Sequence, residues 1–322
     1  MGILEALLQG ILQGLTEFLP VSSSGHLSLF QRFFLPDGQS SLFFTMMLHL
    51  GTLAAVIAAF YEDIWRLIKE LGFCIRDIFT GRFSLKTQDP YRKLLYMLVL
   101  ATLPMVLIVP IRGMVSGMAE DKDIVAEGIF FLITGALLYF ATRVKPGRAG
   151  IGKMKPKHAL ILGIVQDFAV FPGLSRSGST ISAGMIMGFE RAFMVKFSFL
   201  MSIPVILGGA VFEIGDAVKA ENTVGAWPMF LGMLAAAVFG YLSIQLIKWL
   251  LLSDKFVVFA WYTLILGAIC VVVGIILHIV AAASGDASAV SSLVSSVTSG
   301  ASNPSSVASS IAQSVSSVAS AA

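Results

Sequence analysis

Apolar stretches long enough to cross a membrane recur along the whole chain, and they limit its fold more than any other feature. A helix needs about 20 mostly apolar residues to span the hydrocarbon core of a bilayer. The six stretches that we interpret as spans are residues 43–60, 94–111, 128–142, 197–212, 228–247 and 256–280, the third being short for a span. Because 57% of the residues are hydrophobic and only 13% are charged, the sequence predicts an all-α polytopic membrane protein and not a soluble domain.

The composition also excludes several classes of function. The formal net charge is only +3, and the basic residues lie in loops beside apolar runs, where they set membrane topology. We therefore expect no nucleic-acid partner. The two cysteines, Cys74 and Cys270, provide neither a disulfide framework nor a metal-ligand cluster. His49, His158 and His278 are scattered, and we interpret them as structural or interfacial.

The charges of the loops predict the orientation of the spans. The segment 143–158 carries several Arg and Lys residues and no acidic one, and the segment 61–93 is also rich in basic residues. By the positive-inside rule both segments lie in the cytoplasm. The acid-rich segments 120–127 and 213–221 then lie outside, and the loops alternate between the two sides of the membrane.

Two further apolar regions, 2–30 and 159–190, are interrupted by Pro, Gly and hydroxyl residues, so neither forms one straight helix. The two regions resemble each other. GILQGLTEFLPVSSSGH at 10–26 aligns with GIVQDFAVFPGLSRSGST at 163–180 after small gaps. Each copy precedes three spans, and the predicted topology enters the two copies from opposite sides. The sequence therefore predicts an inverted-topology internal repeat with two re-entrant broken-helix regions, an architecture that places polar sites near the membrane midplane.

The domain organisation follows from this repeat. We predict a single membrane domain at 1–280, with repeat one at about 2–142 and repeat two at about 159–280. Residues 281–322 form a Ser/Ala-rich tail of low complexity. We interpret the tail as disordered, with a weak interfacial helix as the alternative, and assign no chemistry to it.

The first interrupted region carries an unusual polar set for a membrane segment. Gln13 and Glu17 are four residues apart and share a helical face, and Pro20 then breaks the helix. The polar side chains that follow the break are Ser22, Ser23, Ser24 and His26. A carboxylate at membrane depth costs at least about 2.5 to 3.5 kcal/mol, so it is usually tolerated only beside a cavity or a partner. A polar contact between packed helices is the alternative to a functional site.

The second interrupted region has the composition of an anion-binding turn. It contains Gly173, Ser175, Arg176, Ser177, Gly178 and Thr180 immediately before an apolar helix. Free backbone N–H groups at a helix start favour an anion, and a guanidinium group suits bidentate contact with phosphate. A structural ion pair between Arg176 and Glu17 is the alternative, and it is also compatible with a resting state of a phosphate site.

The repeat is most informative where its two copies differ. Glu17 aligns with Val170, Ser23 with Arg176, and His26 with Ser179. One copy thus supplies an acid, a hydroxyl and an imidazole, the groups of nucleophilic or acid–base catalysis. The other copy supplies groups that hold phosphate.

The segments QGLTEFLPVSSSGH and FPGLSRSGST resemble the two signature motifs of the undecaprenyl-diphosphatase family, the bacitracin-resistance membrane phosphatases. The resemblance covers nearly all of residues 1 to 280. It implies hydrolysis of undecaprenyl diphosphate to undecaprenyl phosphate, which recycles the lipid carrier for cell-wall synthesis and confers bacitracin resistance. It further implies a divalent cation, Mg²⁺ or Ca²⁺, and a multi-pass protein of the bacterial inner membrane whose site opens to the periplasm.

Matching positions carry the family's roles to this chain. Glu17 resembles the essential acid, Ser23 the candidate nucleophile, His26 the partner base or acid, and Arg176 the phosphate clamp. The expected phosphate-binding residues are Ser22, Ser24, Gly173, Ser175, Arg176, Ser177, Gly178 and Thr180, and the expected metal ligands are Glu17 and Gln13. Gln13 occupies a position where the family also uses Glu, which leaves a single carboxylate for the metal. Asp167 is an additional acid that either compensates for this difference or lies at the edge of a cavity.

Our hypothesis is that Ser23, deprotonated with help from His26, attacks the terminal phosphorus. Attack by His26 itself is the alternative. The leading rival function is a polyprenyl-phosphate flippase or secondary transporter, because broken inverted repeats are typical of transporters. A membrane scaffold is a third candidate. The expected partners are a polyprenyl diphosphate, membrane lipids and a second copy of the chain, and the sequence leaves open the prenyl chain length, the metal and any flipping of the product.

Overall fold

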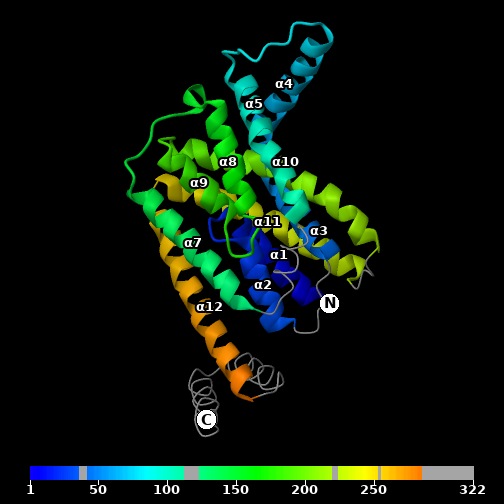
Figure 1. Cartoon of the computed structure of the whole chain (residues 1–322). Coiled ribbons are helices and arrows are strands. Elements are labelled where there is room, and N and C mark those ends of the chain that lie inside the picture. The colour runs from blue at the N-terminus through cyan, green and yellow to red at the C-terminus, as the bar shows by residue number, and fades with distance from the viewer. Residues whose placement is uncertain (36–41, 112–122, 220–223, 253–254, 285–322) are drawn as a thin grey trace.

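The computed structural model describes residues 1–35, 42–111, 123–219, 224–252 and 255–284, and these residues are helical apart from short connections (Figure 1). The elements are α1 (Ile3–Phe18), α2 (Ser23–Phe34), α3 (Leu42–Ala59), α4 (Tyr61–Phe79), α5 (Pro90–Thr102), η1 (Leu103–Ile111), α7 (Ile124–Arg143), η2 (Ile151–Lys153), α8 (Pro156–Phe168), α9 (Arg176–Ile186), α10 (Arg191–Lys219), α11 (Ala226–Leu252) and α12 (Val257–Ser284). The described residues contain no strand beyond an isolated bridge between Ala149 and Phe189. The all-α prediction is therefore confirmed.

The predicted spans appear as long apolar helices. Five segments of the described residues are long and apolar enough to cross a membrane, and a sixth is counted if α3 and α4, which meet at 90°, form one span. We treat α3 as the span, because α4 carries charged residues along its length. Figure 1 shows α4 and α5 projecting together from one end of the molecule, while α12 runs towards the opposite end.

Several spans differ from their predicted limits. The fourth, predicted at 197–212, is α10, Arg191–Lys219, so the helix includes most of the acid-rich segment 213–221 that we placed in an outer loop. The second and third spans also differ. The third is not short, because α7 has 20 residues, Ile124–Arg143. The carboxylate of Asp123 accepts a hydrogen bond from the Val125 backbone N–H and starts the helix earlier than predicted. Glu127, which we placed in an outer loop, is buried within α7. The second span changes from α-helix to the 3₁₀ segment η1 around Pro104, which cannot donate a backbone hydrogen bond.

Both interrupted regions are broken helices, as predicted. Between α1 and α2 the backbone of Ser22 adopts a φ of +68°, and between α8 and α9 Gly173 adopts a φ of +93°. Each second helix begins with a serine cap, since Ser22 accepts from the Gly25 N–H at 3.4 Å and Ser175 from the Gly178 N–H at 3.0 Å. The same local construction thus occurs twice.

The helices of the two predicted repeats pack in corresponding pairs. α3 packs on α10 and α7 on α12, and each of these contacts joins a helix to its counterpart in the other repeat. α1 packs on α11, and their counterparts in the other repeat, α8 and α5, pack on each other in the same way. This pairing brings the two breaks into the interior. The residue limits of the repeats stay a prediction. The predicted tail 281–322 begins within α12, and its remainder, 285–322, lies outside the described residues together with 120–122 of the predicted outer loop.

Candidate active site

The carboxylate of Glu17, in the last turn of α1, joins the two broken regions. Its Oε2 accepts hydrogen bonds from the Ser23 hydroxyl at 2.6 Å and from the Gln13 amide at 3.0 Å. Its Oε1 accepts from Nη2 of Arg176 at 2.7 Å. Glu17 is only 7% exposed, so this charge depends on its partners. Four of the predicted site residues therefore form one connected group.

The ion pair between Glu17 and Arg176 is the alternative that the sequence left open, and it is present. A buried charge that loses its partner typically costs about 3 to 5 kcal/mol. The pair therefore holds the two loops together in this state. His49 of α3 is a second partner for the Glu17 carboxylate and is positively charged when protonated. Its Nε2 lies 3.9 Å from Oε2 of Glu17. We interpreted His49 as structural and missed this proximity, although an ionisable residue within a span is itself a functional signal.

His26 lies in the first turn of α2 but makes no hydrogen bond to Ser23. Its Nδ1 lies 2.7 Å from the Ser22 carbonyl oxygen, and its Nε2 lies 2.7 Å from the hydroxyl of Tyr262. Because a carbonyl oxygen only accepts, Nδ1 carries the proton, and Nε2 of the neutral ring accepts from Tyr262. The ring also stacks on Tyr262, and it meets Phe131 edge to face.

In this state His26 makes no hydrogen bond to Ser23, so the hypothesis that it takes the proton of Ser23 stays a prediction. Both ring nitrogens have other partners, and the Ser23 hydroxyl donates to Glu17. In this state Glu17 is the base within reach of Ser23. Tyr262 was missed by sequence reasoning, because a single tyrosine within an apolar span carries no motif or periodic signal.

The second loop uses its hydroxyl groups mainly to hold its own shape. Ser175 and Ser177 share a hydrogen bond at 3.2 Å, and Ser177 also donates to the Leu19 carbonyl oxygen at 3.1 Å. The Thr180 hydroxyl lies 2.7 Å from that of Ser198. These three residues, predicted to bind phosphate, are buried and already have partners. The backbone N–H groups at the start of α9 are the part of the loop best suited to an anion.

Glycine allows the two loops to meet at backbone distance. A Cβ atom added to Gly25 would lie 2.8 Å from Cα of Gly173, and one added to Gly173 would lie 2.4 Å from the Glu127 carbonyl oxygen. Thr134 of α7 braces this junction by donating to the Gly173 carbonyl oxygen and accepting from the Ser175 N–H. A Cβ atom added to Gly178 would lie 3.3 Å from the Pro20 carbonyl oxygen. Gly173 and Gly178 therefore allow the close packing of the site.

Among the predicted site residues, two buried side-chain atoms have no hydrogen-bond partner in the described part of the chain. They are Oε1 of Gln13 and Nη1 of Arg176. Ser24 is the exposed hydroxyl of the first loop, and Ser22 is a buried cap. A second guanidinium nitrogen without a partner suits a phosphate oxygen, whereas an unpaired amide oxygen beside a carboxylate suits a hard cation.

The expected metal ligands fit a divalent cation in kind. Mg²⁺ is commonly held by one or two carboxylates together with oxygens of a substrate phosphate. Glu17 and Oε1 of Gln13 supply such oxygens on one helical face. Among the described residues no group of three His, Cys, Asp or Glu side chains forms a metal site. Asp167 is buried on α8, and its carboxylate makes no ion pair or hydrogen bond within the described part of the chain, so its compensating role stays a prediction.

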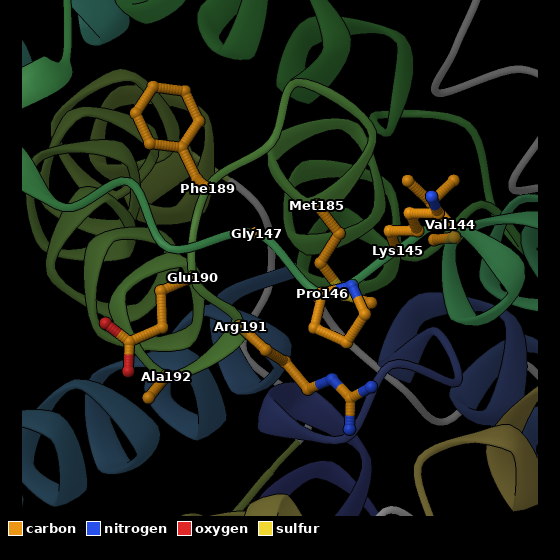
Figure 2. A pocket seen from close by; sticks show the side chains of 10 residues that line it. Val144, Lys145, Pro146, Gly147, Met185, Phe189, Glu190, Arg191 and Ala192 are labelled. Atoms are coloured by element: carbon orange, nitrogen blue, oxygen red, sulfur yellow. The ribbon is translucent and has the colours of Figure 1, made fainter.

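Cavities formed by the described residues include two between these helices. One, of about 280 Å³, lies between the end of α7, the end of α9 and the start of α10 (Figure 2). Its lining includes Lys145, Glu190 and Arg191, but no predicted site residue. The other, of about 290 Å³, lies between α2 and α12, and its first lining residue on α2 is Leu29.

Comparison with known proteins agrees with the motifs. Residues 6–269 match the model of a family described as bacitracin resistance protein BacA. A protein of Methanobrevibacter smithii named undecaprenyl-diphosphatase is 38% identical over 281 residues, which cover 87% of this chain and 100% of the relative. A protein of Alkaliphilus metalliredigens with the same name is 37% identical, covering 83% and 97%. A protein of Bacillus thuringiensis named undecaprenyl-diphosphatase 4 is 36% identical, covering 83% and 95%.

Proposed function

Since the chain belongs to the bacitracin resistance protein BacA family, we propose that it is a membrane phosphatase that hydrolyses undecaprenyl diphosphate to undecaprenyl phosphate and phosphate. The relatives' names supply the reaction. The assignment of residues rests on one observation. Glu17 accepts hydrogen bonds from both Ser23 and Arg176 and so connects the two loops. It brings a hydroxyl, a base and a phosphate-binding cation together in one buried place.

In the proposed reaction Arg176 turns from Glu17 towards the diphosphate when substrate binds. Glu17 then loses its counter-ion, and it accepts the proton of the Ser23 hydroxyl, which already lies 2.6 Å away. Oγ of Ser23 forms a bond to the terminal phosphorus while the bond from that phosphorus to the bridging oxygen breaks. Undecaprenyl phosphate leaves, and water then releases phosphate from Ser23. Arg176 and the α9 N–H groups stabilise charge on the phosphoryl oxygens, the main requirement of phosphoryl transfer.

A divalent cation, Mg²⁺ or Ca²⁺, is part of the proposal. Glu17 and Gln13 would hold it, and the cation would neutralise phosphate charge when bound. Proton transfer and nucleophilic attack are carried out by the side chains. His26, held by the Ser22 carbonyl and Tyr262 one helical turn from Ser23, remains the alternative base.

The test uses the purified full-length protein in detergent with a polyprenyl diphosphate, with and without added divalent cation. We expect metal-dependent phosphate release that Arg176→Ala lowers by at least about 100-fold, the usual scale for a lost charge-stabilising donor. Arg148→Ala is the matched control, because Arg148 lies in the exposed basic segment 143–158. No release by folded wild-type protein would overturn the proposal.

The nucleophile is identified by trapping the phosphorylated protein. We expect an acid-stable phosphoserine at Ser23, absent from Ser23→Ala. An acid-labile phosphohistidine at His26 would replace the serine mechanism with the alternative that the sequence left open.

A second candidate is a polyprenyl-phosphate flippase or secondary transporter. The corresponding helix pairs of the two broken repeats favour it, since transporters use this architecture. Turnover in detergent separates the two functions, because transport needs two compartments. We further propose that the protein recycles the lipid carrier of cell-wall synthesis and confers bacitracin resistance, in the inner membrane with its site open to the outer side.

A further inference from the structure

We propose that the isoprenoid tail of the substrate binds in the apolar groove between α2 and α12, with its diphosphate end at the His26–Tyr262 contact. The proposal rests on the proposed function, and it adds a tail-binding site to the phosphate site. The groove has a volume of about 290 Å³. Its lining is entirely apolar and consists of Leu29, Phe30, Phe33, Phe34, Ile124, Leu266, Ile269, Cys270 and Val273.

The sequence spacing on α2 connects this groove to the active site. Leu29, Phe30 and Phe33 follow His26 by three, four and seven residues. Side chains at these intervals lie on the same helical face. With a rise of about 1.5 Å per residue, the face from His26 to Phe33 is about 10 Å long. The α2 wall of the groove therefore continues the face that carries His26.

The same relation holds on α12. Leu266, Ile269 and Val273 follow Tyr262 by four, seven and eleven residues, so they continue the face that carries Tyr262 for about 16 Å. The hydrogen bond between His26 and Tyr262 joins the two faces at 2.7 Å. That contact lies one helical turn before Leu29 and Leu266, the first lining residues of α2 and α12, and one turn of backbone after Ser23. Figure 1 shows α7 alongside α12, and Ile124, the first residue of α7, belongs to the lining of the groove.

The occupant follows from this continuity. A molecule whose phosphate lies at Ser23 and Arg176 has its attached chain at the His26–Tyr262 end. Membrane lipid is as apolar as the groove, so burial alone gives little preference for entering it. Shape has to provide the selection. The walls are branched or aromatic, with Phe30 and Phe34 stacked at 5.1 Å between ring centroids. Such a surface matches a methyl-branched polyisoprene better than a straight acyl chain.

Tryptophan substitution at one wall tests the proposal. Leu266→Trp fills the groove at the end nearest to Tyr262. Ile265→Trp adds a side chain of the same size at the neighbouring position, which is 58% exposed and faces lipid. The purified full-length variants are assayed with a long-chain polyprenyl diphosphate, with farnesyl diphosphate and with dimethylallyl diphosphate, which has a single isoprene unit.

We expect Leu266→Trp to lower kcat/KM about tenfold for the two longer substrates and less than about twofold for dimethylallyl diphosphate, in line with the usual effect of overfilling a packed site. Ile265→Trp should change kcat/KM by less than about twofold for all three. An equal loss for all substrates in Leu266→Trp, or equal behaviour of the two variants, would overturn the proposal.

A binding experiment separates failure of this site from failure of the proposed function. Wild-type protein is photolabelled with a polyprenyl monophosphate that carries a diazirine on an isoprene unit close to the phosphate. We expect cross-links at Leu29 or Leu266, the lining residues one turn from His26 and Tyr262, displaced by unlabelled polyprenyl phosphate and not by phosphatidylglycerol. Cross-links without any diphosphate hydrolysis would uphold the groove and reject the phosphatase. Equal displacement by phosphatidylglycerol would assign the groove to ordinary phospholipid and overturn the proposal.

Discussion

At the scale of single residues, the chemistry depends on one carboxylate with three hydrogen-bond partners. Glu17 accepts from Gln13, Ser23 and Arg176, so it holds the two loops and also touches the proposed nucleophile. A group in this position has two separable effects when it is changed, one on stability and one on catalysis. The following two predictions separate such effects.

Glu17→Gln should abolish turnover and leave the guanidinium of Arg176 buried without a counter-ion. We expect the free energy of unfolding to fall by about 3 to 5 kcal/mol. Arg176→Gln in the same protein removes the stranded charge, so the double variant should be more stable than the sum of the single changes predicts. Unfolding in detergent measures the coupling. Strictly additive losses would mean that the pair contributes no specific interaction.

Tyr262→Phe removes only the hydroxyl that donates to Nε2 of His26 and retains the stacked ring. We expect kcat/KM to fall by about three- to tenfold, the usual value of one lost hydrogen bond. His26→Ala should cause a larger loss, and the double variant should match His26→Ala alone if Tyr262 acts through the imidazole. An additional loss in the double variant would instead show a separate role for the hydroxyl.

The sequence predicted part of this residue network. Glu17, Ser23 and Arg176 belong to motifs whose composition is costly in lipid, so their grouping was foreseeable. His49 and Tyr262 come from α3 and α12, at large sequence separations and within apolar runs. Only the packing of helices brings them to the site. The direction in which His26 faces was equally beyond sequence reasoning, because it depends on Tyr262.

At the scale of elements, the breaks in the helices followed from Pro and Gly, whereas the helix starts depended on single caps. The early start of α7 shows the limit of hydropathy, since Asp123 and Glu127 resembled a loop although the latter is buried inside the helix. A polar residue that meets its partner in the interior does not end a span. In this case Ser28 donates to Glu127 at 2.7 Å.

Gly173 is the element-scale position most sensitive to a single methyl group. Its φ is +93°, and an added Cβ would meet the Glu127 carbonyl oxygen at 2.4 Å. Gly173→Ala should therefore lower the free energy of unfolding by at least about 1 to 3 kcal/mol and impair turnover. Gly150→Ala is the control, because nothing lies within 4 Å of its Cβ position. Similar melting temperatures for the two variants would show that the loop junction relaxes easily.

The contact between α4 and α5 should respond to acid. Hydrogen bonding from Arg92, at 2.8 Å, lowers the pKa of Asp77 below its usual value, with a further contribution from Arg76. Because the folded pKa is the lower one, this stabilisation is present above the unfolded pKa of about 4 and is lost as pH falls through the folded pKa. The protection of α4 amides against hydrogen exchange, measured relative to the intrinsic rate at each pH, should fall below about pH 4 in wild type. Asp77→Asn should already be less protected at neutral pH and should show a smaller acid-dependent change, with the Glu70 pair of Arg92 accounting for the remainder.

At the scale of the whole molecule, the repeat explains why a site made of two short motifs is complete. Each broken helix leaves backbone polar groups that lipid cannot satisfy. Bringing the two breaks together gives each loop polar partners in the other, as Ser177 donates to the Leu19 carbonyl and Arg176 to Glu17. The difference between the copies then supplies the chemistry, since identical loops would provide two acids or two cations. An inverted arrangement therefore stabilises the site and permits its asymmetry.

The orientation of this arrangement is testable through the charges that predicted it. Arg148 lies in the basic segment 143–158. Trp227 is the second residue of α11, follows the acid-rich segment 213–221 and is 72% exposed. In intact cells we expect a membrane-impermeant maleimide to label Trp227→Cys directly and Arg148→Cys only after permeabilisation. The native Cys74 and Cys270 are buried, so their labelling provides a low background. Labelling of both introduced cysteines from the same side would contradict the predicted topology, because an odd number of crossings would no longer separate these two positions.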